Sequence, residues 1–104
     1  MAMATINPTT GLTEKEFELH DAAEVERRIA LAQSAHEVLK AMSYAERAKL
    51  MHIAADLVEA DIDESAKMLT VEMGKPIAQS RAEVLKCAKN MRFYADNSEA
   101  FLAP

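Results

Sequence analysis

The sequence predicts a mainly α-helical fold that follows a short N-terminal β-hairpin. Apolar residues recur every three to four positions over most of residues 21–104, as they do in amphipathic helices. The stretch before them lacks this period and carries Asn, Pro, Thr and Gly at residues 7–11, which is typical of a turn between two strands. We therefore divide the chain into a hairpin segment, residues 1–20, and a helical segment, residues 21–104.

The hairpin is expected to pair a strand at Thr5 and Ile6 with a second segment at residues 12–19. The apolar side chains Leu12, Phe17 and Leu19 alternate only partly with polar ones in that second segment. A two-stranded hairpin is marginally stable in water. We expect this one to need another part of the protein to dock on.

Two helices are expected to begin with the same capping device, an Asp or Ser followed three residues later by Glu. Asp21 and Glu24 open the first helix, which should end near Met42. Ser43 and Glu46 open the second. The apolar stripe of the first helix comprises Val25, Ile29, Ala32 and Leu39, and that of the second comprises Leu50, Ile53, Ala54, Leu57 and Val58.

An acidic stretch at residues 59–64 predicts a break, after which Ile62, Ala66, Leu69 and Met73 continue at helical spacing. Gly74 is expected to close this third helix in the left-handed conformation, and Pro76 follows it.

The last helix is predicted to run from about residue 78 to 100. Its main apolar line is formed by Val84, Ala88, Met91, Ala95 and Leu102, with Cys87, Tyr94 and Phe101 beside it. So wide an apolar arc predicts burial on more than one side. We expect more protein to follow Pro104.

Composition excludes several classes of protein. The 104 residues suffice for one small domain, and with half of them apolar and 28% charged the chain should be globular and soluble. A net charge of −5 disfavours nucleic acid as a partner. No apolar run reaches the roughly 20 residues that cross a membrane, so no membrane partner is expected.

Location is inferred from the cysteine count and the N-terminus. Cys87 is the only cysteine, so no internal disulfide can form. The start of the chain, Met1 to Asn7, lacks the basic and apolar blocks of a signal peptide. These features predict a cytoplasmic protein.

Cys87 is the obvious candidate nucleophile. A reactive thiol needs a nearby base or a helix N-terminus, whereas Cys87 falls inside the last helix between Lys86 and Lys89. We expect a small packed residue instead. Met51, Met68, Met73 and Met91 are likewise expected to fill gaps in the core.

Metal sites are also weakly indicated. His20, His36 and His52 are scattered and lack the spacing of a zinc helix, so packing or surface roles are expected. Four residues match positions of a calcium loop, but Ala66 replaces the glycine that its sharp turn requires, and a solvated acidic helix face explains them better. These four are Asp61, Asp63, Ser65 and Glu72.

Phosphate-binding motifs fail on their fixed positions. Gly74-Lys75 resembles part of a phosphate loop, but Leu69 and Pro76 occupy two of its other required positions. Gly11 and Gly74 are the only glycines, so no dinucleotide-binding fingerprint can be built. The basic residues of the last helix are expected to form a solvated face held by weak pairs within that helix. They are Arg81, Lys86, Lys89 and Arg92.

Five blocks of the chain nevertheless form a familiar series. They are residues 4–11 (ATINPTTG), 43–48 (SYAERA), 69–76 (LTVEMGKP), 82–88 (AEVLKCA) and 93–95 (FYA). In this order they resemble the amino-terminal region of the aldehyde dehydrogenase superfamily, most closely its succinate-semialdehyde dehydrogenases. His36 and Leu39 depart from the pattern, because members of this subgroup usually carry aromatic residues there.

The resemblance implies an NAD- or NADP-dependent enzyme of α/β fold, usually a homo-oligomer, that oxidises an aldehyde to a carboxylic acid. In such enzymes a cysteine attacks the aldehyde, hydride passes to the nicotinamide, and a glutamate activates the hydrolytic water. Those residues lie downstream of the region matched here, and Cys87 does not match the nucleophile motif. We therefore assign no catalytic, cofactor-binding or metal-binding residue to this chain.

By the same resemblance, the chain would be one incomplete part of a cofactor-binding domain. It would cover that domain, with the remainder of the enzyme as its partner, and would be inactive alone. One alternative is a self-standing helical module that uses its apolar helix face to bind a partner protein. A weaker one is a metal-binding helical bundle.

Overall fold

The structure, a computed structural model, describes residues 3–104 and contains a two-stranded sheet followed by four helices. The elements are β1 (Met3–Ile6), β2 (Thr13–Phe17), α1 (Ala22–Ala41), α2 (Tyr44–Ala60), α3 (Ile62–Met73) and α4 (Ile77–Leu102). This order confirms the predicted mainly α-helical fold with an N-terminal hairpin. Met1 and Ala2, the first residues of the hairpin segment 1–20, lie outside the described residues.

The hairpin forms because its loop satisfies its own backbone groups. The N–H of Asn7 donates to the carbonyl of Leu12 over 2.9 Å, and the N–H of Gly11 donates back to the carbonyl of Asn7 over 2.8 Å. Gly11 has a φ of +72°, a conformation that glycine adopts without steric cost. Beyond the loop the two strands pair antiparallel, with Met3 opposite Phe17.

The two predicted helix starts differ in detail. The α2 start is a complete capping box: the Ser43 hydroxyl accepts from the Glu46 N–H over 3.2 Å, and the Glu46 carboxylate accepts from the Ser43 N–H over 2.8 Å. In α1, Asp21 accepts from the Glu24 N–H, but the Glu24 side chain binds Arg27 and Arg28 instead of turning back. Two charged donors within the next turn give this carboxylate stronger partners than a backbone N–H.

Helix α3 ends as predicted. Gly74 has φ +70° and ψ 17°, and its N–H donates to the carbonyl of Thr70 over 3.0 Å. This left-handed residue stops α3 and, with Lys75 and Pro76, turns the chain into α4.

The core lies between the last three helices. Helix α4 packs along both α2 and α3, whereas α1 makes no comparable contact with any other described element. The buried residues of the described chain are Ala55, Ala66, Ser80, Val84, Ala88 and Ala95. Most are alanines, which let the helix backbones approach closely but bury little apolar surface. The predicted apolar line of α4 is confirmed at Val84, Ala88 and Ala95.

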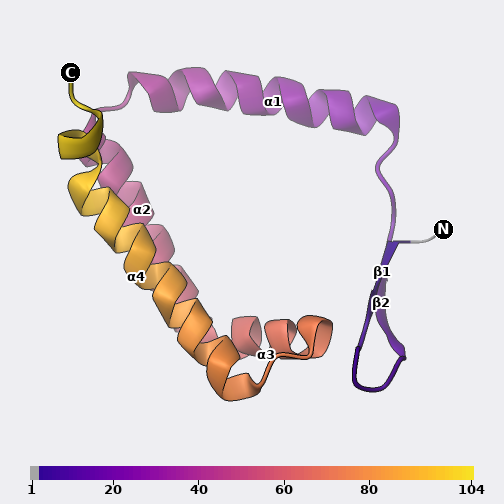
Figure 1. The fold of residues 1–104 in the computed structure, drawn as a ribbon. Helices are drawn as coiled ribbons and strands as arrows, with labels where there is room; N and C mark the ends of the chain where they lie inside the picture. The colour runs from indigo at the N-terminus through magenta and orange to yellow at the C-terminus, as the bar shows by residue number, and fades with distance from the viewer. Residues whose placement is uncertain (1–2) are drawn as a thin grey trace.

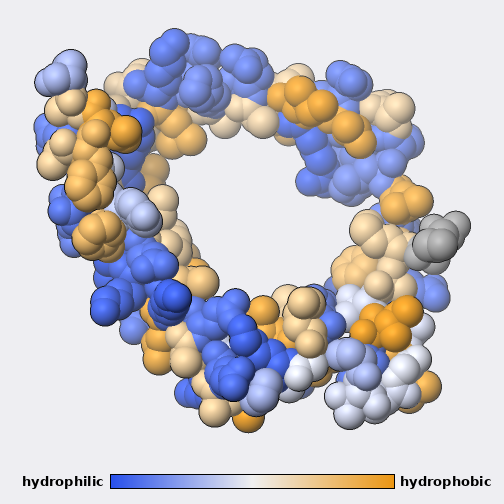
Figure 2. Space-filling view, viewed as in Figure 1, coloured by the Kyte–Doolittle hydropathy of each residue, from blue (hydrophilic) through white to orange (hydrophobic). Residues whose placement is uncertain are grey.

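The shape is an open ring. Helix α1 forms one side, the α2–α4 pair a second, and α3 with the hairpin completes the circuit (Figure 1). The Cα radius of gyration is 17.8 Å, whereas a compact domain of this length has about 13 Å. The chain exposes 8216 Å², compared with about 5,800 Å² for a compact monomer of the same mass. Much of the inner rim is apolar (Figure 2).

The expectation that methionines fill the core was wrong for three of them. Met51, Met68 and Met73 are exposed, Met73 to 73%, and Met91 alone of the four is half-buried. An apolar side chain within a helix can face a neighbouring helix or solvent, and in α2 and α3 these three face away from the small buried core.

Among residues 3–104, no helix combines the length and apolar composition that a membrane crossing requires.

Candidate functional site

Cys87 does not occupy the packed position predicted for it, because its side chain is exposed. Helix α4 turns Val84 and Ala88 toward α2 and α3, and Cys87 lies about 60° and about 100° from them around the helix axis. The shallow hollow beside its thiol is lined only by α4 residues: Ala82, Glu83, Lys86, Cys87 and Asn90. No second element contributes a base to this hollow.

The three histidines remain apart, as predicted. His20 and His36 are exposed, whereas His52 of α2 lies with its Nε2 2.7 Å from Oδ1 of Asp96 on α4. This link between helices was missed, because nothing in the sequence pairs residues 44 positions apart. Within residues 3–104, no three His, Cys, Asp or Glu side chains gather closely enough to hold a metal ion.

The acidic residues that match a calcium loop face different partners. Asp61 accepts from the Ser65 hydroxyl over 2.9 Å, Asp63 pairs with Arg81, and Glu72 accepts from the Thr5 hydroxyl over 3.1 Å. Residues 62–73 are helical, so they do not form the loop that would turn these oxygens toward one point. The run is therefore helical from Ile62, as predicted, but its acidic side chains bind partners as well as solvent.

The basic side chains of α4 bind across to other helices, so the expectation of pairs within α4 was wrong for two of them. Arg81 pairs with Asp63 of α3, and Arg92 donates to Asp56 over 2.8 Å and Glu59 over 2.5 Å, both on α2. The hydrogen bond to Asp56, together with that to Glu59, raises the pKa of Arg92 above its ordinary value. These ion pairs lie at the rim of the helix contacts, where they fix the alignment of α4 against its neighbours.

Exposed apolar surface is the dominant feature of the molecule. On α1 the predicted stripe forms, but Val25, Ile29 and Leu39 remain exposed, Ile29 to 58%. On α2 the predicted stripe is similarly uncovered at Leu50, Ile53 and Leu57. We call this set, together with the aromatic residues of α4 described next, the uncovered apolar surface.

The carboxyl half of α4 carries an aromatic cluster. The rings of Phe93 and Tyr94 meet edge to face with centroids 5.3 Å apart, and the centroids of Phe93 and Phe101 are 6.1 Å apart. Tyr94 is nevertheless 60% exposed. Aromatic side chains bury large areas at interfaces, so this cluster is a strong candidate contact region.

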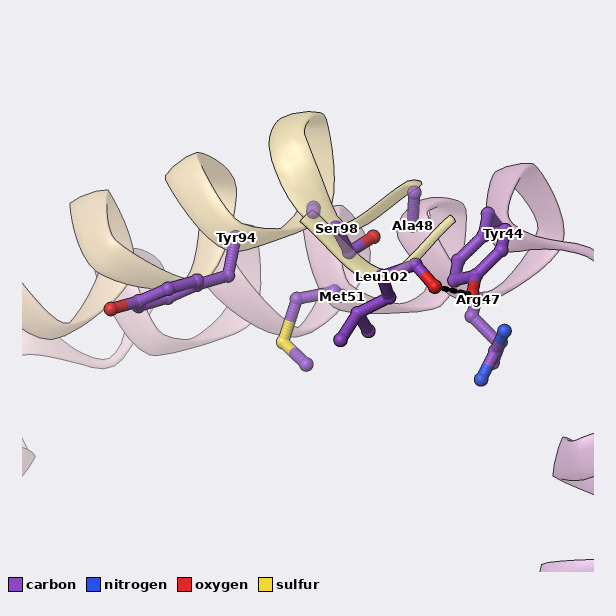
Figure 3. Close-up of a pocket in the computed structure, with 8 residues that line it drawn as sticks. Tyr44, Arg47, Ala48, Met51, Tyr94, Ser98 and Leu102 are labelled. Atoms are coloured by element: carbon purple, nitrogen blue, oxygen red, sulfur yellow. Dashed lines mark hydrogen bonds between the residues drawn. The ribbon is translucent and has the colours of Figure 1, made fainter. Parts of the chain in front are cut away.

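A shallow pocket of about 220 Å³ adjoins this cluster between α2 and the end of α4 (Figure 3). Tyr44 forms one wall, stacked under the guanidinium of Arg47 at 4.7 Å, and its hydroxyl donates to the carbonyl of Leu102 over 3.5 Å. Met51, Tyr94 and Leu102 contribute most of its largely apolar lining, which also includes Ala48, Ala95 and Ser98. The pocket offers a binding surface and no reactive group.

Residues 1–103 match the aldehyde dehydrogenase family. The chain belongs to this family. It is 47% identical over its whole length to an aldehyde dehydrogenase of Paenarthrobacter nicotinovorans, of which it covers 23%. Over 103 residues it is 48% identical to succinate-semialdehyde dehydrogenase [NADP(+)] 1 of Mycobacterium tuberculosis, covering 99% of this chain and 22% of that protein.

A solved aldehyde dehydrogenase of Brucella melitensis has the same arrangement of elements. Its TM-score is 0.87 at 27% sequence identity, covering 96% of this chain and 21% of the other. This chain thus spans less than a quarter of the length of the curated relatives it matches. These similarities confirm the family resemblance stated from the sequence blocks.

Proposed function

We propose that this chain is the N-terminal part of an NADP- or NAD-dependent succinate-semialdehyde dehydrogenase and covers its cofactor-binding domain. The observation that carries the proposal is the coincidence of a family match over residues 1–103 with an open, ring-shaped fold. An open ring with apolar faces is understandable if a second body of the same protein lies against those faces.

The size of the exposed area supports an extensive contact. The chain exposes about 2,400 Å² more than a compact monomer of its mass would. Obligate interfaces bury roughly 2,000–5,000 Å² in total, half of it on each partner, and are more hydrophobic than transient ones. The excess area is therefore on the scale of one side of a large obligate interface.

The described residues do not fit a dinucleotide site. Binding of a pyrophosphate in such sites uses glycines at the start of a helix. Here Gly11 lies in the hairpin loop, and Gly74 is a lone glycine between the carboxyl end of α3 and the start of α4 at Ile77, without the further glycines of such a motif. We therefore derive no step of cofactor chemistry through this chain, and we assign the nucleophile, the general base and the cofactor contacts to residues outside it.

The proposal extends to three further properties. The chain is expected to be inactive alone, to lie in the cytoplasm with the rest of its enzyme, and to belong to a homo-oligomer. Relatives that are 46–48% identical to this chain are named succinate-semialdehyde dehydrogenases, which supports succinate semialdehyde as the substrate. The cofactor assignment follows from the same names, which specify NADP.

An activity assay tests the proposal directly. The purified 104-residue chain and the product of the complete reading frame are each mixed with succinate semialdehyde and NADP or NAD, and nicotinamide absorbance is followed. Only the complete product should reduce the cofactor. It should prefer succinate semialdehyde to butanal by more than about tenfold in kcat/KM, because butanal lacks a carboxylate. Aldehyde-dependent reduction by the short chain would refute the inactivity.

The coding sequence beyond residue 104 discriminates between the enzyme part and a self-standing binding module. A continuing frame that encodes a cysteine nucleophile motif supports the enzyme. A stop codon directly after Pro104 would instead support the module. The far greater length of the relatives favours the enzyme.

A further inference from the structure

The turn between α3 and α4 lies so close to the hairpin loop that a side chain at Gly74 would crowd it. A Cβ atom built on Gly74 would lie 3.1 Å from Cγ of Pro8 and 3.8 Å from its Cβ. The first distance is shorter than ordinary carbon–carbon contact. Glycine at position 74 therefore suits both the left-handed conformation and the close approach of Pro8, which would have to move by a few tenths of an ångström to admit a Cβ.

Two neighbouring side chains attach the same turn to other elements. Two residues before Gly74, the Glu72 carboxylate accepts a hydrogen bond from the Thr5 hydroxyl of β1 over 3.1 Å. One residue after it, Lys75 forms an ion pair with Glu83 of α4. Figure 1 shows the carboxyl end of α3 directed toward the hairpin.

We infer that residues 72–75 form a seat that sets the position of the hairpin relative to α3 and α4. Among residues 3–104, one side-chain hydrogen bond joins the strands to a helix, and it runs from Thr5 to Glu72. A two-stranded hairpin is marginal by itself, so its placement depends on such contacts. Within this seat Glu72 binds the strand, Gly74 leaves room for Pro8, and Lys75 holds the turn against α4.

A matched pair of glycine substitutions tests the seat in the complete enzyme. The use of the full-length protein rests on the proposed function, whereas the contacts of the seat do not. Gly74→Asn and Gly11→Asn place the same residue at nearly the same φ, +70° and +72°, and Asn tolerates this conformation. Only at position 74 does the new Cβ meet a residue distant in the sequence. A Cβ built on Gly11 has no such atom within 4 Å. The comparison therefore isolates the contact with Pro8.

The readout is hydrogen exchange, measured by mass spectrometry, of the backbone amides in peptides covering the hairpin. Gly74→Asn is expected to speed exchange of β1 and β2 by about tenfold, within the range of coupling between contacting residues, and Gly11→Asn by less than about twofold. Adding Pro8→Ala to Gly74→Asn removes the Cγ atom that crowds position 74. The double variant should then exchange hairpin amides almost as slowly as the Pro8→Ala single variant.

Equal exchange in the two Asn variants, or no rescue by Pro8→Ala, would overturn the seat. If Gly74→Asn fails to fold, Thr5→Val with Glu72→Gln replaces it. Each single variant should then speed hairpin exchange, and the double variant should add little to either. Full additivity would contradict a shared contact. Exchange is measured without substrate, so a protein that lacks dehydrogenase activity would refute the proposed function and leave this test intact.

Discussion

The hydroxyl oxygens of Thr70 on α3 and Ser80 on α4 lie 3.0 Å apart, and Ser80 is fully buried. This is the polar contact at the centre of the small core. The close approach of the two helices at this point requires a small residue, and the hydrogen bond satisfies its hydroxyl inside the protein.

Replacing Ser80 is expected to destabilise the complete enzyme according to the size of the new side chain. Ser80→Ala loses one hydrogen bond and should cost about 1 kcal/mol. Ser80→Leu forces extra atoms into a filled contact and should cost about 1–3 kcal/mol or more. Melting temperatures check both. Ser34→Ala on the exposed face of α1 is the control and should change little.

The capping box of α2 predicts a pH-dependent contribution to stability. Hydrogen bonds from the backbone and side chain of Ser43 lower the pKa of Glu46 below its ordinary value of 4.5. Because the folded-state pKa is the lower one, this stabilisation is present above pH 4.5 and is lost as pH falls through the folded-state pKa.

Ser43→Ala tests the side-chain part of this contribution, because the backbone N–H of Ser43 can still donate to Glu46. It should cost about 1 kcal/mol at neutral pH, as losses of helix caps do. The difference in stability between the variant and the parent should shrink as pH falls below 4.5, and denaturant titrations at several pH values measure it. A difference that stays constant down to pH 3 would mean that the hydrogen bond between the Ser43 hydroxyl and the Glu46 carboxylate contributes nothing to the pH dependence.

Arg92 is expected to contribute modestly and in a salt-dependent way. Its guanidinium bridges Asp56 and Glu59, so Arg92→Met removes both ion pairs between α4 and α2. Exposed pairs are weak and screened by salt. The melting temperature should fall by about 1–2 °C at low ionic strength and by less in 1 M NaCl.

Lys86→Met is the matched control for Arg92→Met. It removes the same charge from the same helix at an exposed position, outside the ion pairs described for Arg92. It should leave the melting temperature nearly unchanged at both salt concentrations. An equal effect of the two variants would assign the change to net charge rather than to the bridge.

The sequence was most informative where structure is set by neighbours along the chain. Asp21, Ser43 and Gly74 act within one helical turn, so their roles follow from local hydrogen bonding. The strand pairing around residues 7–11 follows for the same reason. Apolar period also placed Val84, Ala88 and Ala95 on the buried side of α4.

Long-range contacts could not be predicted in the same way. His52 with Asp96, Arg92 with Asp56, and Thr5 with Glu72 join residues 36 to 67 positions apart. Exposure of Cys87 and Met73 was missed for a related reason. The helical spacing of apolar residues identifies an apolar stripe. It does not say whether this chain or another part of the protein covers that stripe.

The exposed area also predicts the behaviour of the chain in isolation. Helix α1 buries no residue, and the six buried side chains among residues 3–104 all belong to α2, α3 and α4 and include four alanines. The hydrophobic contribution that stabilises a fold scales with buried apolar area, at roughly 25 cal/mol per Å². The purified chain should therefore bind a hydrophobic dye and unfold in urea over a broad range, with α1 and the hairpin losing protection first. Circular dichroism, dye fluorescence and sedimentation measure these properties together. A sharp cooperative transition in a monomer that binds no dye would show that the uncovered apolar surface needs no partner.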